Sequence, residues 1–195
     1  MSESVSAVPA VIAGWIVAAL AVAGSGALAS LPPPAVPFLI WSPVVIGVWA
    51  WRRLPAVRAF ADGIDLRLAV LYHLVRVVFG ALFLWEMRAG RLPAAFAMIA
   101  GPGDIAAGLL AIPAAWLINR EGEGPRRICL AWNLFAFVDI LAVFASAQRM
   151  LFVERDLRFF ALVRTLPYAT LPMLVVPLIL LTHLLIFQRL RRSRR

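Results

Sequence analysis

The chain has 195 residues, of which 63% are hydrophobic and only 15% are charged, and its mean hydropathy is +0.90. A soluble domain is about half apolar and about a quarter charged, so a single water-soluble fold of this composition would lack the polar residues to cover its surface. The 19 basic residues are all arginine, against 10 acidic residues, and the net charge is +9. Because lysine is missing, a retinal or pyridoxal Schiff base and a P-loop are excluded.

Six stretches are apolar and long enough to cross the roughly 30 Å hydrocarbon core of a bilayer, which takes about 20 helical residues. Bounded by charges and prolines, they run at about 8–30, 35–51, 66–87, 93–118, 128–148 and 161–187. The sequence therefore predicts an all-α fold, a polytopic integral membrane helix bundle with six transmembrane helices in a single transmembrane domain, 1–195.

The first stretch allows two interpretations. It ends in Ala27-Leu28-Ala29, which fits the small-residue pattern of a secretory cleavage site. However, the leading residues include Glu3 and no basic residue, whereas a signal peptide begins with positive charge. We therefore expect a membrane span, and cleavage after residue 29 stays open as the alternative.

The fourth stretch carries Gly101-Pro102-Gly103-Asp104 near its middle. Pro102 lacks a backbone N–H and the glycines weaken a helix, so we expect the fourth helix to break near 101–104, with Asp104 capping the half that continues. A break at this depth is tolerated only inside protein or beside a water-filled cavity, as at many transporter sites. A proline kink that Asp104 satisfies locally is the alternative.

Between the fifth and sixth stretches, residues 149–160 alternate apolar and charged side chains at helical spacing. The apolar residues at 150, 153, 157 and 160 would share one face of a helix. This pattern predicts a short helix on the outer membrane surface, with a solvated loop as the alternative.

The basic residues predict the orientation of the chain in the membrane. With both termini in the cytoplasm, twelve arginines lie at the inner face, six lie at the outer face and Arg76 lies inside a span. Basic residues favour the cytoplasmic side, so we expect a bacterial inner-membrane protein with this topology. The cytoplasmic tail 189–195 could bind anionic lipid headgroups, or it could only set the topology. A homo-oligomer or a protein partner is possible, and no nucleic-acid partner is expected.

Three ionisable residues fall near the middle of the predicted spans: Arg76, Asp104 and Asp139. At 1.5 Å per residue, each lies about 14–18 Å from the predicted outer edge. A charge at this depth costs at least a few kcal/mol, so each needs a partner. One interpretation is structural, with Arg76 pairing with a carboxylate and joining helices. The other is functional: one arginine does not neutralise two acids, so the second carboxylate binds a proton or a cation.

Residues 101–104 also fit the Gly-x-Gly-Asp pattern, and so resemble the intramembrane aspartyl proteases of the presenilin-like and prepilin-peptidase families. The resemblance implies that Asp104 is the motif aspartate and Asp139 its partner, the two acting as general acid and base on a water. Leu171-Pro172-Met173-Leu174 is distantly similar to the Pro-Ala-Leu segment of the presenilin-like branch. In those families the partner aspartate precedes the motif, whereas no aspartate lies in the first three spans predicted here.

The two histidines, His73 and His183, lie at similar depths, about 10 Å and about 9 Å from the predicted inner edge. Matching depth on two spans is what axial ligation of a b-type haem needs, so haem b is a possible cofactor. A histidine hydrogen-bonded between helices is the alternative. No metal site is predicted, because Cys129 is the single cysteine and two histidines alone do not complete a zinc site.

These patterns favour permeation or transport of a small solute or ion through a buried cluster of Arg76, Asp104 and Asp139, with Gly101 and Gly103 at the break. An enzyme is not the favoured interpretation. The alternatives are an aspartyl protease that uses Asp104 and Asp139, a haem protein, and a structural or assembly subunit.

Overall fold

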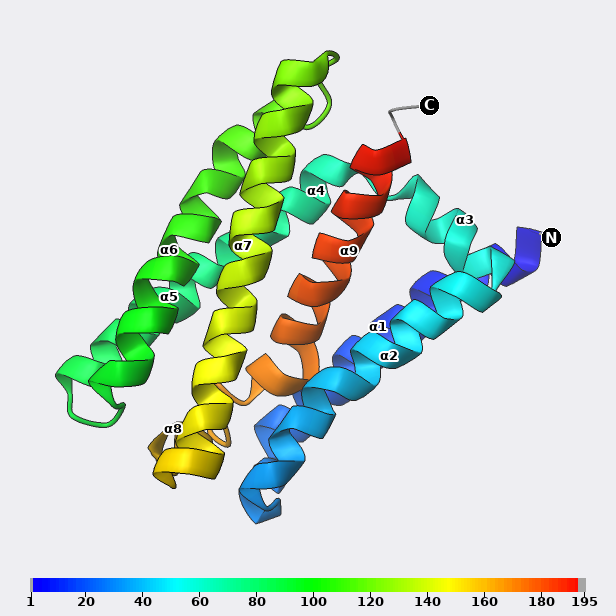
Figure 1. The fold of residues 1–195 in the computed structure, drawn as a ribbon. Coiled ribbons are helices and arrows are strands. Elements are labelled where there is room, and N and C mark those ends of the chain that lie inside the picture. Colours follow the sequence, from blue (N-terminus) through cyan, green and yellow to red (C-terminus); the bar gives the residue numbers. More distant parts are fainter. Residues whose placement is uncertain (1, 193–195) are drawn as a thin grey trace. The chain divides into compact units, whose positions relative to one another are not determined.

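The computed structural model describes residues 2–192, which form helices joined by short turns (Figure 1). Within this range no strand is present. Six helical segments are long and apolar enough to cross a membrane, which confirms the predicted all-α fold with six membrane-spanning helices. They are Ala7–Ser25, Pro33–Arg53, Leu66–Arg88, Ala94–Leu117, Glu123–Glu154 and Leu171–Arg192.

The chain folds into two compact units. The first unit comprises the chain up to Ile64 together with Phe160–Leu181. The second comprises Asp65–Phe159 and the chain from Thr182 onward. Helix α9 (Val176–Arg192) therefore contributes residues to both units.

The first unit begins with α1 (Ser2–Ser25), which starts and ends earlier in the chain than the predicted span at about 8–30. Gly26 follows it with a φ of 75°, in the left-handed region that favours glycine and commonly ends helices. The chain then turns through two short 3₁₀ helices, η1 (Ala27–Ser30) and η2 (Pro33–Ala35), into α2 (Val36–Arg53) and α3 (Pro55–Gly63).

Small side chains allow the elements of the first unit to pack closely. Ala23, Leu28 and Ala169 form a buried cluster, against which Val22, Leu31, Leu39 and Met173 pack. Gly47 of α2 lies against Leu181, since a Cβ added to Gly47 would fall 3.0 Å from a methyl carbon of that leucine.

The second unit contains the third to fifth spans and the last part of α9. The third span comprises α4 (Leu66–Leu71), a 3₁₀ turn η3 (Tyr72–Leu74) and α5 (Val75–Arg88). Asp65 caps its start, because the backbone N–H of Arg67 donates to the Asp65 carboxylate at 2.8 Å. Helices α6 (Ala94–Leu117) and α7 (Glu123–Arg149) follow, and α6 packs against both α5 and α7 (Figure 1).

The predicted break in the fourth helix is wrong, because α6 is helical without interruption from Ala94 to Leu117. Pro102 removes one backbone donor and its side chain is exposed. Membrane-spanning helices tolerate proline, because neighbouring helices and local adjustments satisfy the freed backbone groups. Gly101 does not unwind α6; it allows α6 and α5 to pack closely. A Cβ on Gly101 would lie 2.6 Å from Leu84, and one on Gly80 of α5 would lie 2.7 Å from the Gly101 carbonyl oxygen.

The predicted surface helix at 149–160 is also partly wrong, because its first half continues the fifth span. A π-helical turn, η4 (Met150–Glu154), extends α7, and Arg155 ends it with a φ of 55°. The short helix α8 (Arg158–Leu162) follows. The Arg158 N–H donates to the Asp156 carboxylate at 3.0 Å, and the hydrogen bond from the Arg158 side chain lowers the pKa of Asp156.

The last span begins later than predicted. The π-helical turn η5 (Leu171–Val175) leads into α9, whereas residues 163–169, within the predicted span at 161–187, form turns around Pro167. Proline cannot continue the hydrogen bonding of a helix from the preceding turn, which is consistent with this later start. Three arginines of the predicted tail, at 189, 191 and 192, form the last turn of α9. Residues 193–195 of that tail lie outside the described residues.

Candidate functional site: a buried charged triad and a histidine pair

The side chain of Arg76 lies at the centre of the second unit, with 1% of its surface exposed. Its guanidinium donates through all three nitrogens. Nε donates to Asp104 Oδ1 at 2.7 Å, one terminal nitrogen donates to the Ala136 carbonyl at 2.8 Å, and the other donates to Asp139 Oδ2. One arginine on α5 thus binds α6 and α7 together.

The sequence placed Arg76, Asp104 and Asp139 at one depth, and the structure brings these three side chains together. We call them the charged triad. Gly103 makes room for it, because a Cβ at this position would overlap the Asp139 carboxylate. The role of Gly103 therefore differs from the predicted one, since it admits the carboxylate of α7 to the surface of an intact helix.

The two carboxylates of the triad differ in burial. The Asp104 side chain is 6% exposed and that of Asp139 is 11% exposed. Both are paired with the same cation, so the triad carries two negative charges and one positive charge when all three groups are ionised. The net charge of −1 has no compensating partner within the triad, and an uncompensated buried charge is costly.

A second polar cluster involves His73 in η3, one helical turn before Arg76. Its ring lies 4.3 Å, centroid to centroid, from the ring of His183 on α9, and both side chains are fully buried. Trp132 of α7 covers the His73 ring at 5.2 Å, edge to face. We call His73 and His183 the histidine pair.

Neighbouring side chains anchor one nitrogen of each imidazole. His73 Nε2 lies 3.2 Å from the Thr182 hydroxyl, and His183 Nδ1 lies 2.7 Å from Asn133 Oδ1. The Asn133 amide donates in turn to the His183 carbonyl at 3.2 Å. Thr182 gave no signal in the sequence, because a single threonine in an apolar span is common.

The geometry does not support haem between His73 and His183. Axial ligation requires the macrocycle to lie between the two imidazoles, whereas these rings contact each other directly at 4.3 Å. The two histidines meet, as their matching depth on two spans predicted. Their rings are direct neighbours, however, so no space for a macrocycle lies between them.

The arrangement of Asp104 and Asp139 also differs from that of an aspartyl protease. In such an enzyme two carboxylates share a proton and hold a water between them. Here each carboxylate accepts a hydrogen bond from Arg76, whose guanidinium bridges the two acids. The Gly-x-Gly-Asp segment therefore belongs to an ion-paired cluster, and no protease chemistry follows from it.

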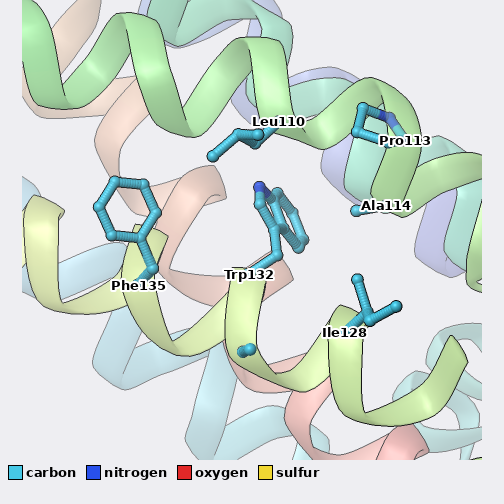
Figure 2. A pocket seen from close by; sticks show the side chains of 7 residues that line it. Leu110, Pro113, Ala114, Ile128, Trp132 and Phe135 are labelled. Carbon is cyan, nitrogen blue, oxygen red and sulfur yellow. The ribbon is translucent and has the colours of Figure 1, made fainter. Parts of the chain in front are cut away.

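The surface between α6 and α7 has a shallow apolar pocket of about 350 Å³. Figure 2 shows Leu110, Pro113 and Ala114 of α6 facing Ile128, Trp132 and Phe135 of α7 across it. The Trp132 indole N–H donates to the Ala107 carbonyl at 3.0 Å, so its polar atom is satisfied inside the protein. An open pocket lined by apolar side chains is what a lipid-facing groove between two helices offers, and it does not reach the polar residues as a channel would.

Fold and site together define a helical membrane protein with a net-charged cluster buried among its spans. The chain belongs to the family described as "Domain of unknown function (DUF8737)", whose model matches residues 33–191. That match covers every residue of the charged triad and of the histidine pair. Comparison with the curated proteins and with the solved structures gave no match.

Proposed function

We propose that this protein carries a small cation across the membrane, and that the charged triad binds the cation. The observation that supports the proposal is the charge of the triad: two carboxylates face one guanidinium deep in the second unit. A bound cation would bring the triad to neutrality. Only one unit of negative charge in the triad is left to attract the cation, so the cation is bound weakly enough to be released.

Asp139 is the better candidate for contact with an incoming cation, because its side chain is the more exposed of the two carboxylates. Asp104 accepts from Arg76 Nε in a nearly closed environment, so its charge is committed to the arginine. We propose that Asp104 holds Arg76 in position and that Asp139 binds and releases the cation. Arg76 keeps the two acids at a fixed distance from each other.

The proposed setting is a bacterial inner membrane with both termini in the cytoplasm. This orientation places twelve arginines at the inner face and six at the outer face. The arginines of the last turn of α9, at 189, 191 and 192, would then lie near anionic lipid headgroups of the cytoplasmic leaflet.

Flux through reconstituted vesicles tests the proposal. Purified protein is placed in liposomes loaded with dyes for protons, sodium or potassium, and a gradient of each cation is applied in turn. We expect the wild type to pass one of these cations, and Asp104→Asn and Asp139→Asn each to reduce that flux at least tenfold. Each substitution removes one negative charge and so makes the triad neutral, which should preserve folding in detergent.

Glu123→Gln is the matched control, because it removes a carboxylate whose side chain is 58% exposed and whose partners, Arg126 and Arg127, lie at the start of α7. This variant should keep wild-type flux. If the wild type passes no cation faster than empty liposomes do, or if both aspartate variants keep wild-type flux, the proposal is wrong.

A structural role is the second candidate, and the three hydrogen bonds of Arg76 to α6 and α7 favour it. Under this interpretation the triad only joins helices. It predicts absent wild-type flux together with a large loss of stability in Arg76→Met, about 3–5 kcal/mol, because two buried carboxylates would lose their partner.

A further inference from the structure

The apolar pocket between α6 and α7 lies near the turn that joins these two helices. Its residues on α6 run from Leu110 to Ala114, close to the end of that helix at Leu117. Its residues on α7 begin at Ile128, close to the start of that helix at Glu123 (Figure 2). The pocket therefore opens beside the charged residues around the turn. We call this pocket the α6–α7 groove.

Arg127 stands at the end of the groove on the α7 side. It precedes Ala131, which lines the groove, by four residues, so the two side chains lie on one face of the helix. The Arg127 side chain is 77% exposed, and its Nε lies 3.6 Å from a carboxylate oxygen of Glu123. An exposed ion pair of this kind contributes little free energy. A phosphate can therefore compete with Glu123 for the guanidinium.

Arg120 brings a second guanidinium to the same end from the α6 side. Its central carbon lies 3.7 Å from the centre of the Trp116 ring. Trp116 follows Pro113, a residue of the groove, by three positions, so the two are neighbours on the surface of α6. Stacking on an aromatic ring uses the flat face of a guanidinium and leaves its N–H edge for hydrogen bonds. Arginines from both sides of the turn thus lie near the end of the groove.

The surface of α7 is open at this end. Gly124 lies four residues before Ile128, which places both on one face of α7. A Cβ added to Gly124 would meet no atom within 4 Å. The groove therefore continues into open space, with room for a headgroup beside the arginines.

Arginine outnumbers acid at this end of the second unit. The Arg126 side chain donates to the Leu190 carbonyl at 2.9 Å, so the last turn of α9 lies against the start of α7. Residues 120–127 and 189–192 together hold six arginines and two glutamates, a net charge of +4. Basic pockets between membrane helices bind anionic lipid headgroups. The charge of the surroundings is thus complementary to an anion at the end of the groove.

We propose that the α6–α7 groove binds one anionic phospholipid, with an acyl chain in the apolar pocket and the phosphate between Arg120 and Arg127. The pocket of about 350 Å³ is lined by apolar side chains, which suit a hydrocarbon chain. Arginine N–H groups bind phosphate oxygens in pairs. A zwitterionic lipid offers the same chain and phosphate, but its ammonium group would meet the excess of arginine. The site therefore selects lipids by headgroup charge.

Native mass spectrometry of the intact chain in detergent tests this site. The purified protein is mixed with equal amounts of palmitoyl-oleoyl phosphatidylglycerol, which is anionic, and palmitoyl-oleoyl phosphatidylcholine, which is zwitterionic. We expect the wild type to retain one phosphatidylglycerol in preference to phosphatidylcholine. Equal retention of the two lipids overturns the proposal. A dimer without bound lipid also overturns it, because the groove would then belong to an interface with a second copy of the chain.

Substitutions of single arginines locate the headgroup. Arg120→Gln and Arg127→Gln should each weaken phosphatidylglycerol retention about fivefold, which corresponds to the roughly 1 kcal/mol that one arginine contributes at an anionic lipid surface. Arg88→Gln is the matched control, because it removes an exposed arginine at the end of α5, next to the start of α6. This variant should retain the lipid as the wild type does. If it weakens retention equally, the lipid responds only to the net charge of the protein and the proposed site is wrong.

Ala131→Phe tests the apolar part of the site. Ala131 is exposed and lines the groove, so a phenyl ring there would take the place of the acyl chain and leave every charge intact. We expect retention of phosphatidylglycerol to fall about fivefold or more, while thermal unfolding without lipid stays as in the wild type. Unchanged retention would show that no chain lies in the groove and would overturn the proposal. These outcomes do not depend on whether the charged triad carries a cation.

Discussion

Gly103 holds no charge, yet the geometry of the charged triad depends on it. Its missing side chain leaves the space that the Asp139 carboxylate occupies. Glycine inside a helix otherwise destabilises it by about 0.5–1 kcal/mol relative to alanine. At this position the loss is offset by an ion pair that no larger residue would allow.

Gly103→Ala should therefore destabilise the protein, although alanine favours a helix. The new Cβ would displace Asp139 from Arg76, and we expect a loss of about 1–3 kcal/mol, as for other overpacked sites. Thermal unfolding in detergent measures the effect, and cation flux should fall with it.

Gly14→Ala is the control for this prediction, because no atom lies within 4 Å of the Cβ it would add to α1. It should leave stability unchanged or raise it by up to about 1 kcal/mol. Equal behaviour of the two alanine variants would contradict the proposed role of Gly103.

Depth along the spans was enough to predict that Arg76, Asp104 and Asp139 meet, because a buried charge requires a partner and few were present. Sequence alone could not show which atoms bind which. The donation from Arg76 to the Ala136 carbonyl depends on how α5 and α7 are rotated about their axes, and backbone acceptors leave no trace in the side-chain pattern.

At the scale of the helix, the proline and glycines at 101–104 do not interrupt α6, although the sequence predicted that they would. The sequence placed a break at 101–104 in α6, but the distorted part of the neighbouring span is η3, at Tyr72–Leu74. This segment contains neither proline nor glycine. It lies where α6 comes close, because the His73 carbonyl oxygen would be only 3.0 Å from a Cβ on Gly108 of α6. A contact of this kind between two helices cannot be predicted from the sequence of either helix alone.

Pro102→Ala tests whether an intact helix is what the site needs. The Pro102 side chain is exposed, so alanine leaves no cavity and restores one backbone N–H. We expect equal or higher thermal stability and wild-type flux.

Pro113→Ala is the comparison for this variant, since it makes the same change in the same helix at another exposed position, away from Asp104. Loss of flux in Pro102→Ala alone would show that the site needs the local backbone of a proline.

At the scale of the whole chain, composition was sufficient for the fold class. With 63% hydrophobic residues, the six spans could be located from the spacing of charges and prolines. Their ends were less predictable: the fifth extends to Glu154 through a π-helical turn, and the last begins at Leu171. Turns of this kind depend on the packing of the helix ends, which apolar composition does not encode.

The proposed orientation is open to chemical labelling. Cys129 is fully buried and donates to the Ala114 carbonyl at 3.5 Å, so it should not react with an impermeant maleimide. In intact cells, we expect the reagent to label Ala89→Cys, between α5 and α6, and to spare Glu121→Cys, between α6 and α7. Permeabilised cells should show labelling of both. The reverse pattern in intact cells would place the termini outside.

The ion pairs of Arg76 also bear on biogenesis. A nascent span with an arginine at its centre enters the bilayer less readily, by about 2.5–3.5 kcal/mol on insertion scales. Its first carboxylate partner, Asp104, is synthesised next, on the helix that packs closest to α5 at Gly80 and Gly101. We therefore expect the translocon to release these two spans as a hairpin, with Asp139 joining once the following helix has emerged from the ribosome.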